Sequence, residues 1–240
     1  MGENEDAFYD LTGERVEDWF ARYFAENATN DIGYPLRVTT EEFKRYWNFH
    51  ELFILHHPNE AVSKSRLPSS SKAFLLEIGV PVCALPDFEF FDESEFFVRL
   101  SEYHHIASCY DRFLVIGQNV NGGKFTLCVD EESGRVVLFL LRDLLSCLET
   151  LDANEVKLAD SAFQPNFVNS SIEQLFHCCL AHEVMARETK RVNGSEAWPD
   201  KQIPLTVRDW YINWIPHIDS AAIVENRFWA KIIRELPQGV

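Results

Sequence analysis

The stretch FLVIGQNVNGGKFTLCVDEESGRVVLF, residues 113–139, restricts the fold more than any other part of the chain. It is rich in β-branched and aromatic residues, and it is interrupted twice by residues that favour turns. Asn121-Gly122-Gly123 tolerates the positive φ that a hairpin turn requires, and residues 131–134 form the second interruption. The pattern therefore predicts three antiparallel strands joined by two tight turns.

The same strands indicate which side chains are buried. In the middle strand the apolar side chains alternate, and we expect Phe125, Leu127 and Val129 to point inward. Residues 136–141 form an unbroken apolar run, which predicts a central strand covered on both faces. Residues 88–100 and 106–118 are again rich in aromatic and β-branched residues around acidic interruptions, so we expect a meander of about four to six antiparallel strands.

The segments before this sheet have helical patterns. Residues 12–26 and 40–49 carry apolar side chains at helical spacing. We therefore expect residues 1–70 to form a helical N-terminal extension packed on a main domain that covers residues 71–240.

The segment between these helices and the sheet contains glycine and proline residues that predict a helix end followed by a turn. Residues 54–66 have little periodicity and contain Pro58, which predicts an irregular connection. Ser69 to Ser71 are expected to cap a short helix that ends at Gly79 in the left-handed conformation. Pro81 follows closely and prevents the helix from continuing.

Helical periodicity returns after the sheet. Asn169 or Ser170 is expected to cap a long helix, a second helix is expected up to Pro216, and a third over residues 220–236. The long helix is expected to bury one side, made of Ile172, Leu175, Phe176, Cys179 and Leu180. The order of helices, sheet and helices predicts an α+β fold in which a mostly antiparallel sheet is flanked by helices.

Composition limits the function. Hydrophobic residues make up 46% of the chain, which is enough for a packed core, and the formal net charge of −16 repels phosphate backbones and anionic lipid head groups. We therefore expect neither nucleic acid nor membrane as a direct partner. The sequence lacks an apolar run of membrane-spanning length and a basic-then-apolar leader, so we expect a cytoplasmic protein. The six cysteines mostly lie in apolar runs, which indicates reduced thiols rather than a disulfide framework.

Three patterns could carry chemistry, and each has a simpler structural interpretation. Cys178 and His182 are four residues apart on one helix and could share a metal ion. Two ligands do not make a metal site, however. We therefore expect Cys178 in the core and His182 at the surface or in a capping role. The adjacent pairs His56-His57 and His104-His105 cannot chelate alone, because neighbouring side chains diverge. The run from Asp130 begins like a calcium loop but lacks the Glu at its twelfth position, so a hairpin turn is expected. We expect no catalytic residue, no metal and no cofactor.

Acidic residues interleaved with aromatic residues indicate a docking surface as an alternative to an ordinary solvated strand face. In DFEFFDESEFF, carboxylates could steer a basic partner while phenylalanines provide buried anchors. The partner-binding residues that we expect, from this run and from the second turn of the meander, are Asp92, Glu93, Glu95, Glu131 and Glu132.

Several segments together resemble the bacterial immunity-protein branch of the SUKH superfamily. They are FLLEIGVP, FLVIGQN, FTLCVDEESGRVVLF, FVNSSIEQLFHCCLAHE and ENRFWAKIIREL, spread over about residues 70–235. The resemblance implies an α+β fold, no enzymatic activity, and the binding and occlusion of a toxin, often a nuclease or deaminase, used between competing bacteria. It also implies scaffold roles for Ile116-Gly117, Asn169-Ser170-Ser171 and Phe228-Trp229. The first 70 residues contain no segment that matches this pattern.

Two other classes of function remain open at this point. One is a metal-dependent or thiol enzyme that uses Cys178, His177 and His182. The other is a regulatory scaffold for an endogenous partner. The leading hypothesis is a non-enzymatic protein-binding module that neutralises a basic toxin domain.

Overall fold

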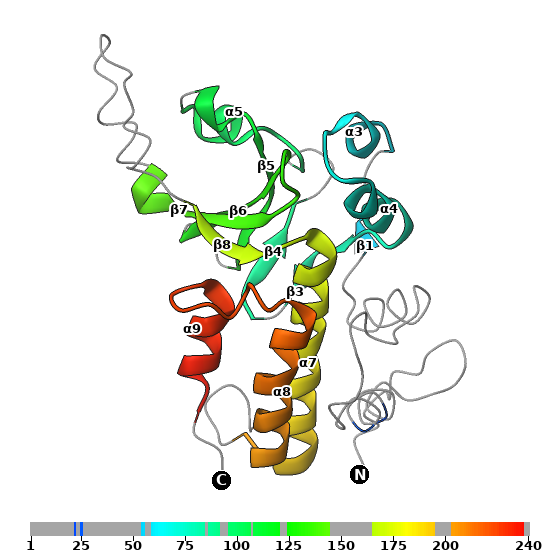
Figure 1. Ribbon diagram of the computed structural model, residues 1–240, viewed down its shortest axis with the longest axis vertical. Helices are drawn as coiled ribbons and strands as arrows, with labels where there is room; N and C mark the ends of the chain where they lie inside the picture. Colours follow the sequence, from blue (N-terminus) through cyan, green and yellow to red (C-terminus); the bar gives the residue numbers. More distant parts are fainter. Residues whose placement is uncertain are drawn as a thin grey trace, which may run out of the picture.

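The computed structural model describes residues 54–55, 59–84, 86–91, 96–106, 108–120, 124–144, 165–194 and 203–237, together with Arg22 and Ala25. Arg22 and Ala25 are helical, in agreement with the helix predicted over residues 12–26. The rest of that helix and the helix predicted over residues 40–49 lie outside the described residues. Figure 1 shows a sheet in the upper half of the molecule and the long helices α7 and α8 side by side below it.

Six strands form one antiparallel sheet. They are β3 (Cys83–Ala84), β4 (Phe88–Phe90), β5 (Phe113–Asn119), β6 (Phe125–Asp130), β7 (Val136–Leu140) and β8 (Asn166–Asn169). The strand order in the sheet is the order along the chain, β3-β4-β5-β6-β7-β8, and each neighbouring pair is antiparallel. The predicted meander and the α+β class are confirmed.

The three strands predicted from residues 113–139 pair as expected. In the registers Leu114 lies opposite Val129, and Leu127 lies opposite Leu138. The second turn contains Gly134 at φ +73°, while residues 121–123 of the first turn lie outside the described residues.

The middle strand β6 is covered on both faces, which the predicted alternation did not anticipate. Leu127 and Val129 are fully buried, but Cys128 between them is also fully buried, and Phe125 is only half-buried. The short helix α5 (Leu100–His104) explains part of this cover, because His104 Nε2 lies 2.7 Å from Thr126 Oγ1. This helix was missed, because its sequence continues an aromatic stretch that predicts strand.

A bulge in β5 accounts for Gly117. The pairing of β5 with β6 shifts register between Val115 and Gly117. A Cβ atom on Gly117 would collide with the backbone oxygen of Glu89 in β4, and a backbone atom cannot move away cheaply. Glycine is therefore required by the close approach of two strands.

The segment before the sheet is more regular than predicted. Residues 54–66 contain strand β1 (Ile54–Leu55), paired with β2 (Val80–Pro81), and helix α3 (Asn59–Lys64), so the irregular connection predicted there is wrong.

Helix α4 (Ser69–Glu77) confirms the predicted end but corrects the predicted start. Gly79 has a φ of +80°, as expected. Ser69 to Ser71 are the first helical residues rather than caps, because the helix starts after Pro68, whose carbonyl accepts from Lys72 N at 3.1 Å. The side chains of these serines are therefore not needed to begin the helix.

The helices after the sheet also differ from the predictions at their ends. Helix α7 (Ile172–Asn193) is capped by Ser171, which accepts from Gln174 N, and not by Asn169 or Ser170. Helix α8 (Leu205–Ile218) continues through Pro216. It loses only one backbone bond there, since Asp219 N still donates to Ile215 O at 3.0 Å. Helix α9 (Phe228–Glu235) starts about eight residues later than predicted, after a series of turns.

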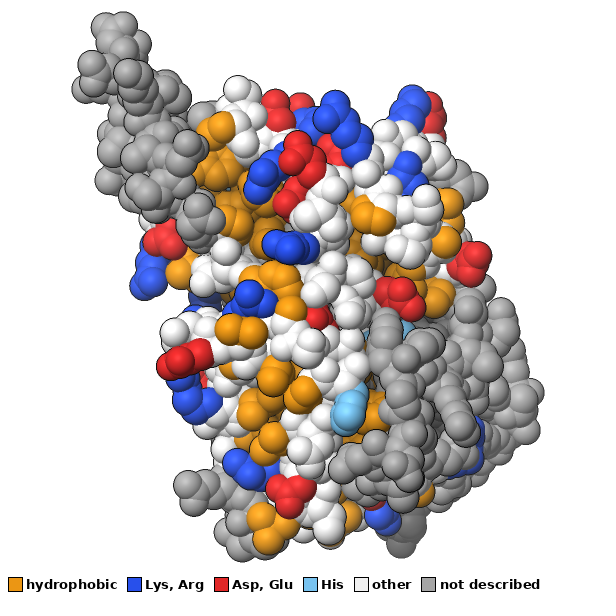
Figure 2. Space-filling model, viewed as in Figure 1, with side chains coloured by type: hydrophobic (Ala, Val, Ile, Leu, Met, Phe, Trp, Pro, Cys, Tyr) orange, Lys and Arg blue, Asp and Glu red, His pale blue; other side chains and the backbone are white. Residues whose placement is uncertain are grey.

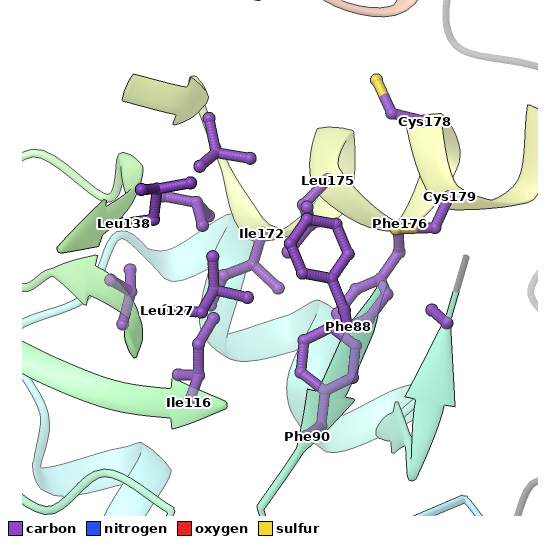
Figure 3. Close-up of a cluster of buried hydrophobic side chains, with 14 of the residues drawn as sticks. Phe88, Phe90, Ile116, Leu127, Leu138, Ile172, Leu175, Phe176, Cys178 and Cys179 are labelled. Carbon is purple, nitrogen blue, oxygen red and sulfur yellow. The ribbon is translucent and has the colours of Figure 1, made fainter. Parts of the chain in front are cut away.

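The core lies between the sheet and α7. Figure 3 shows Phe88, Phe90, Ile116, Leu127 and Leu138 of the sheet on one side and Ile172, Leu175 and Phe176 of α7 on the other. The ring centroids of Phe90 and Phe176 are 5.0 Å apart, and Phe74 of α4 stacks on Phe176 from its other side at 5.6 Å. Val62 and Leu67 belong to the same buried cluster, so residues before position 70 contribute to this core. The division at residue 70 stays a prediction.

A buried carboxylate joins the elements of the C-terminal half. Asp219 is 3% exposed, and its oxygens accept hydrogen bonds from Ser170 N at 2.7 Å, Ser170 Oγ at 3.0 Å, Asn169 Nδ2 at 3.2 Å and Ala221 N at 3.1 Å. Asn169 in turn accepts from Trp229 Nε1 at 2.8 Å. The end of β8, the start of α7, the end of α8 and the start of α9 therefore meet in one hydrogen-bonded network.

Replacement of this carboxylate is expected to destabilise the fold strongly. Asp219→Ala leaves buried donors without an acceptor, so we expect the free energy of unfolding to fall by about 3–5 kcal/mol. The measurement is urea unfolding followed by circular dichroism. Asp209→Ala, at an exposed position on the same helix, is the matched control and is expected to change stability by less than about 0.5 kcal/mol. Equal effects of the two variants would contradict this account.

Candidate functional site

The expected partner-binding residues fall into two groups. Asp92, Glu93 and Glu95 lie outside the described residues. The residues on either side of them are held by neighbouring residues of β5: Phe91 N donates to Ile116 O at 3.2 Å, and Phe97 N donates to Val115 O at 2.7 Å. Phe91 and Phe97, which flank the acidic run in the sequence, are thus attached to the sheet.

The second group divides into one buried and one exposed carboxylate. The side chain of Glu131 is only 6% exposed; its Oε1 accepts from Arg66 N at 2.6 Å, and its Oε2 lies 3.5 Å from Arg99 Nη1. The side chain of Glu132 is 63% exposed, with Arg112 Nη1 at 3.8 Å. Glu131 therefore holds the turn in place and offers a partner little surface, whereas Glu132 is open to a partner.

The turn itself is the hairpin predicted from the sequence and not a calcium loop. Asp130 accepts from Glu132 N at 3.1 Å and from Ser133 Oγ at 2.8 Å, so its carboxylate is used within the turn. Glu131 N donates to Arg112 O at 2.8 Å, which ties the turn to the start of β5.

One member of the second group, Glu131, lines a cavity. We call it the rim cavity; its volume is about 180 Å³, and it is lined by Ala61, Lys64, Ser65, Phe97, Arg99, Leu114 and Glu131. Glu131 comes from the second turn, and Phe97 follows the acidic run by two residues. Figure 2 shows acidic and basic side chains interleaved at the end of the molecule that carries α3 and α5.

Sequence reasoning included Phe97 among the aromatic anchors of DFEFFDESEFF but missed Arg99. Phe97 has a φ of +66°, an unfavourable conformation for a bulky side chain, and its ring stacks on Phe96 with centroids 4.4 Å apart. Such backbone conformations persist only where the surroundings enforce them, and they gather at binding sites. The Phe96-Phe97 pair after the acidic run indicated aromatic anchors in the sequence. No sequence pattern predicted the backbone conformation of Phe97 or the cavity.

The negative charge of the chain is unevenly distributed along the sequence. The described residues include 16 Lys or Arg and 17 Asp or Glu, so they are nearly neutral. The other 21 of the 38 acidic residues lie in the remaining segments, chiefly residues 1–53 and 145–164. An electrostatic contribution to partner binding would therefore come mainly from those segments.

The region considered for enzymatic chemistry is closed. Cys178 and Cys179 are fully buried, and burial raises the pKa of both thiols well above its usual range. Figure 3 shows Cys178 pointing away from the sheet, where it accepts from Asn169 Nδ2 at 3.4 Å. A protonated thiol without access to solvent is a poor nucleophile.

The histidines of the same helix are also in the interior. His182 was expected at the surface but is 3% exposed, and its Nδ1 lies 2.9 Å from Tyr211 Oη of α8. The reason is that α8 covers the side of α7 that faces away from the sheet. In the described ranges no three His, Cys, Asp or Glu side chains are grouped so that they could hold a metal ion.

The remaining predicted histidine pairs do not form a site in the described ranges either. His104 is half-buried against Thr126, while His105 is exposed and ends α5 in the left-handed conformation. His56 and His57 lie outside the described residues.

These features define a class of protein: an α+β scaffold with an antiparallel sheet and the rim cavity between loops at one end. The thiols and imidazoles of α7 are enclosed in the core of this scaffold. A model of the SUKH-4 immunity protein family matches residues 38–235, and the chain belongs to this family. The match begins earlier than the resemblance noted from the sequence, so it includes part of the segment before residue 70. No curated protein and no solved structure was found to match the chain. The described helices include none that is both long and apolar enough to cross a bilayer.

The difference between Glu131 and Glu132 can be measured as stability. Glu131→Ala removes the acceptor of Arg66 N and the partner of Arg99, and we expect a loss of about 1–3 kcal/mol. Most of this loss comes from the partly buried hydrogen bond to Arg66 N, because Arg99 is partly solvated and its ion pair is screened. Glu132→Ala, the adjacent control, is expected to change stability by less than about 0.5 kcal/mol in urea unfolding. Equal losses would show that Glu131 is not an internal anchor.

The enclosed histidines predict a dependence of stability on pH. Burial lowers the pKa of His177 to about 4 and that of His182 to about 3, whereas an unfolded chain has a histidine pKa of about 6.5. Their contribution is therefore complete above about pH 6.5 and is lost as the pH falls through that value, because only the unfolded chain takes up protons. We expect the two residues together to lower the free energy of unfolding by roughly 2–3 kcal/mol between pH 7.5 and pH 5.5.

Urea unfolding at several pH values checks this expectation. His182→Gln removes one of the two groups, so the pH dependence should fall by about half even where the variant is less stable overall. An unfolding free energy that is flat between pH 7.5 and pH 5.5 would show that these imidazoles are not held neutral by burial.

Proposed function

We propose that this protein is an immunity protein that binds a bacterial toxin domain and blocks it by occlusion, with no bond made or broken. The observation that carries the proposal is the match of the SUKH-4 immunity protein family over residues 38–235. Immunity families of this kind are generally not enzymes, and the enclosed thiols and imidazoles of α7 are consistent with that.

The rim around the rim cavity is the surface that we assign to the toxin. It combines the exposed Glu132, the aromatic Phe97 and the acidic run of Asp92, Glu93 and Glu95. Charged loops around an aromatic anchor give fast association and a well-buried centre, which is the usual anatomy of a tight interface. The bulged and hydrogen-bonded β5 supplies a rigid base for both sides of the rim.

The net charge indicates the kind of toxin. A chain at −16 attracts a cationic surface, and toxins that act on nucleic acid, such as nucleases and deaminases, require one. The immunity protein would act in the cytoplasm of the producing cell, where the toxin's substrate lies. On this proposal it contacts neither nucleic acid nor membrane directly.

Co-expression with the toxin domain encoded next to its gene tests the proposal. We expect cells that express the toxin to survive when the full chain is present, and the two proteins to co-purify as a complex. The control is the same chain with Asp219→Ala, which disrupts the fold. Survival that does not depend on the chain, or a complex that leaves the toxin fully active, would contradict an immunity function. Stable binding to an endogenous protein instead would favour a regulatory scaffold.

The contribution of the acidic rim is tested by charge reversal. The double variant Glu93→Lys, Glu132→Lys is expected to slow association with the toxin by about threefold to tenfold at low salt and to weaken the salt dependence. The control Glu77→Lys, Glu225→Lys changes the net charge equally at exposed positions on other elements. Stopped-flow association at several salt concentrations gives the comparison. Equal slowing by both pairs would mean that net charge, and not the rim, steers the encounter.

A further inference from the structure

The ion pair in the rim cavity is incompletely hydrogen-bonded. Arg99 Nη1 donates to the backbone oxygen of Asp111 and lies 3.5 Å from Glu131 Oε2, a distance that makes an ion pair without a good hydrogen bond. Among the described residues, Arg99 Nε and Nη2 donate to no acceptor, and Glu131 Oε2 accepts from no donor. The cavity wall thus offers unused N–H donors and an unused carboxylate acceptor side by side.

We propose that the rim cavity binds a primary amide, the side chain of an Asn or Gln of the toxin; this rests on the proposed function. An amide carries an acceptor and donors next to each other. Its carbonyl oxygen accepts from Arg99, and its NH₂ group donates to Glu131 Oε2. Both unused groups of the ion pair are satisfied by one neutral ligand.

The charges around the cavity favour a neutral occupant over either ion. An ammonium or guanidinium group would face Arg99 and Lys64, while a carboxylate would face the nearly buried Glu131. Lys64 is paired at 2.5 Å with Glu60, which lies outside the lining, so the charged lining residues and Glu60 together carry no net charge. Leaving an ion beside a like charge in a partly desolvated recess is unfavourable, and an amide avoids that cost.

The remaining walls fit the aliphatic part of such a side chain. Ala61, Phe97 and Leu114 are apolar, and a volume of about 180 Å³ has room for several water molecules or for a small side chain. The left-handed backbone of Phe97 places this ring at the cavity. The cavity can therefore contact the methylene groups of Gln or Asn while the ion pair binds the amide.

Small probes test this chemistry on the full chain without any toxin. Propionamide, sodium propionate and propylammonium chloride share a three-carbon chain, are similar in size and differ in charge. In ¹H–¹⁵N NMR titrations at matched ionic strength, we expect propionamide to shift the amide signals of Phe97, Arg99 and Glu131, with a dissociation constant on the order of 10–100 mM, as suits five heavy atoms. The two ions are expected to bind at least about fivefold more weakly at this place, since each faces a like charge.

Two variants show whether the probe sits in the rim cavity. Ala61→Leu, at an exposed position of α3, fills the cavity and should abolish the shifts, whereas Ser63→Leu on the same helix does not line the cavity and should leave them unchanged. Arg99→Lys keeps the charge but removes the guanidinium fork, and should weaken propionamide binding at least about threefold. Absence of shifts, shifts that survive Ala61→Leu, or stronger binding of either ion overturns the proposal.

The outcomes separate this inference from the proposed function. If the chain protects against the toxin while propionamide does not bind, immunity stands and the amide site falls. If propionamide binds while the chain gives no protection, the amide site stands and immunity falls. Where both hold, Ala61→Leu is expected to weaken the toxin complex at least about tenfold relative to Ser63→Leu, and an equal affinity of the two variants would place the toxin's amide elsewhere.

Discussion

The hydrogen bonds to Asp219 are the constraint on which the rest of the C-terminal half depends. A buried carboxylate is unfavourable unless its oxygens are fully bonded, and here they accept from the backbone and side chain of Ser170, from Asn169 and from Ala221. The same Asn169 accepts from the buried indole of Trp229, so the last helix is held by the same set of bonds. With these bonds in place, the end of the sheet, the start of α7 and the end of α8 have one possible arrangement, and α7 is held against the sheet with its apolar side toward Phe88 and Phe90.

That fixed arrangement matters for the proposed function because the described residues of the rim are built on the sheet and its core. Phe97 is positioned by backbone bonds to β5, and Glu131 by bonds to Arg112 and Arg66. Both residues are therefore held on strand β5, which is buried along most of its length and packs closely against β4 at Gly117. A binding surface held in this way loses little conformational entropy when a partner arrives, which leaves more of the contact energy for affinity.

The sequence was informative wherever the cause of a structure is local. Gly79 and Gly134 occupy the left-handed positions that turn chemistry predicts, and the strands around them pair in the expected order.

The predictions that were wrong are those in which the structure depends on contacts with residues far away in the sequence. Asn169 and Ser170 look like helix caps, but Asp219, about fifty residues later, uses them, and Ser171 takes the cap instead. His182 is polar and was placed outside, but α8 covers it. Glu131 was grouped with Glu132 by composition, although Arg66 and Arg99, remote in sequence, make one of them internal. The cavity follows from these same remote contacts, so no local pattern could have shown it.

The distribution of charge separates long-range attraction of a partner from discrimination between partners. The sequence analysis had assigned both to the same acidic residues. Long-range attraction needs net charge and no particular geometry, and most of the excess acidic residues lie in segments outside the nearly neutral described scaffold. Screening limits that attraction to about 8–10 Å at physiological salt, so it can raise the rate of encounter but cannot discriminate between similar basic surfaces. Discrimination between partners needs groups at fixed positions with unused hydrogen-bonding capacity. In the proposed site Arg99 and Glu131 are such groups. Each is held by a hydrogen bond to the backbone, and neither fully satisfies the other. On the proposed function, the acidic segments could therefore change in sequence with little effect on which toxin is recognised, whereas a change at either member of this ion pair would alter the choice of partner.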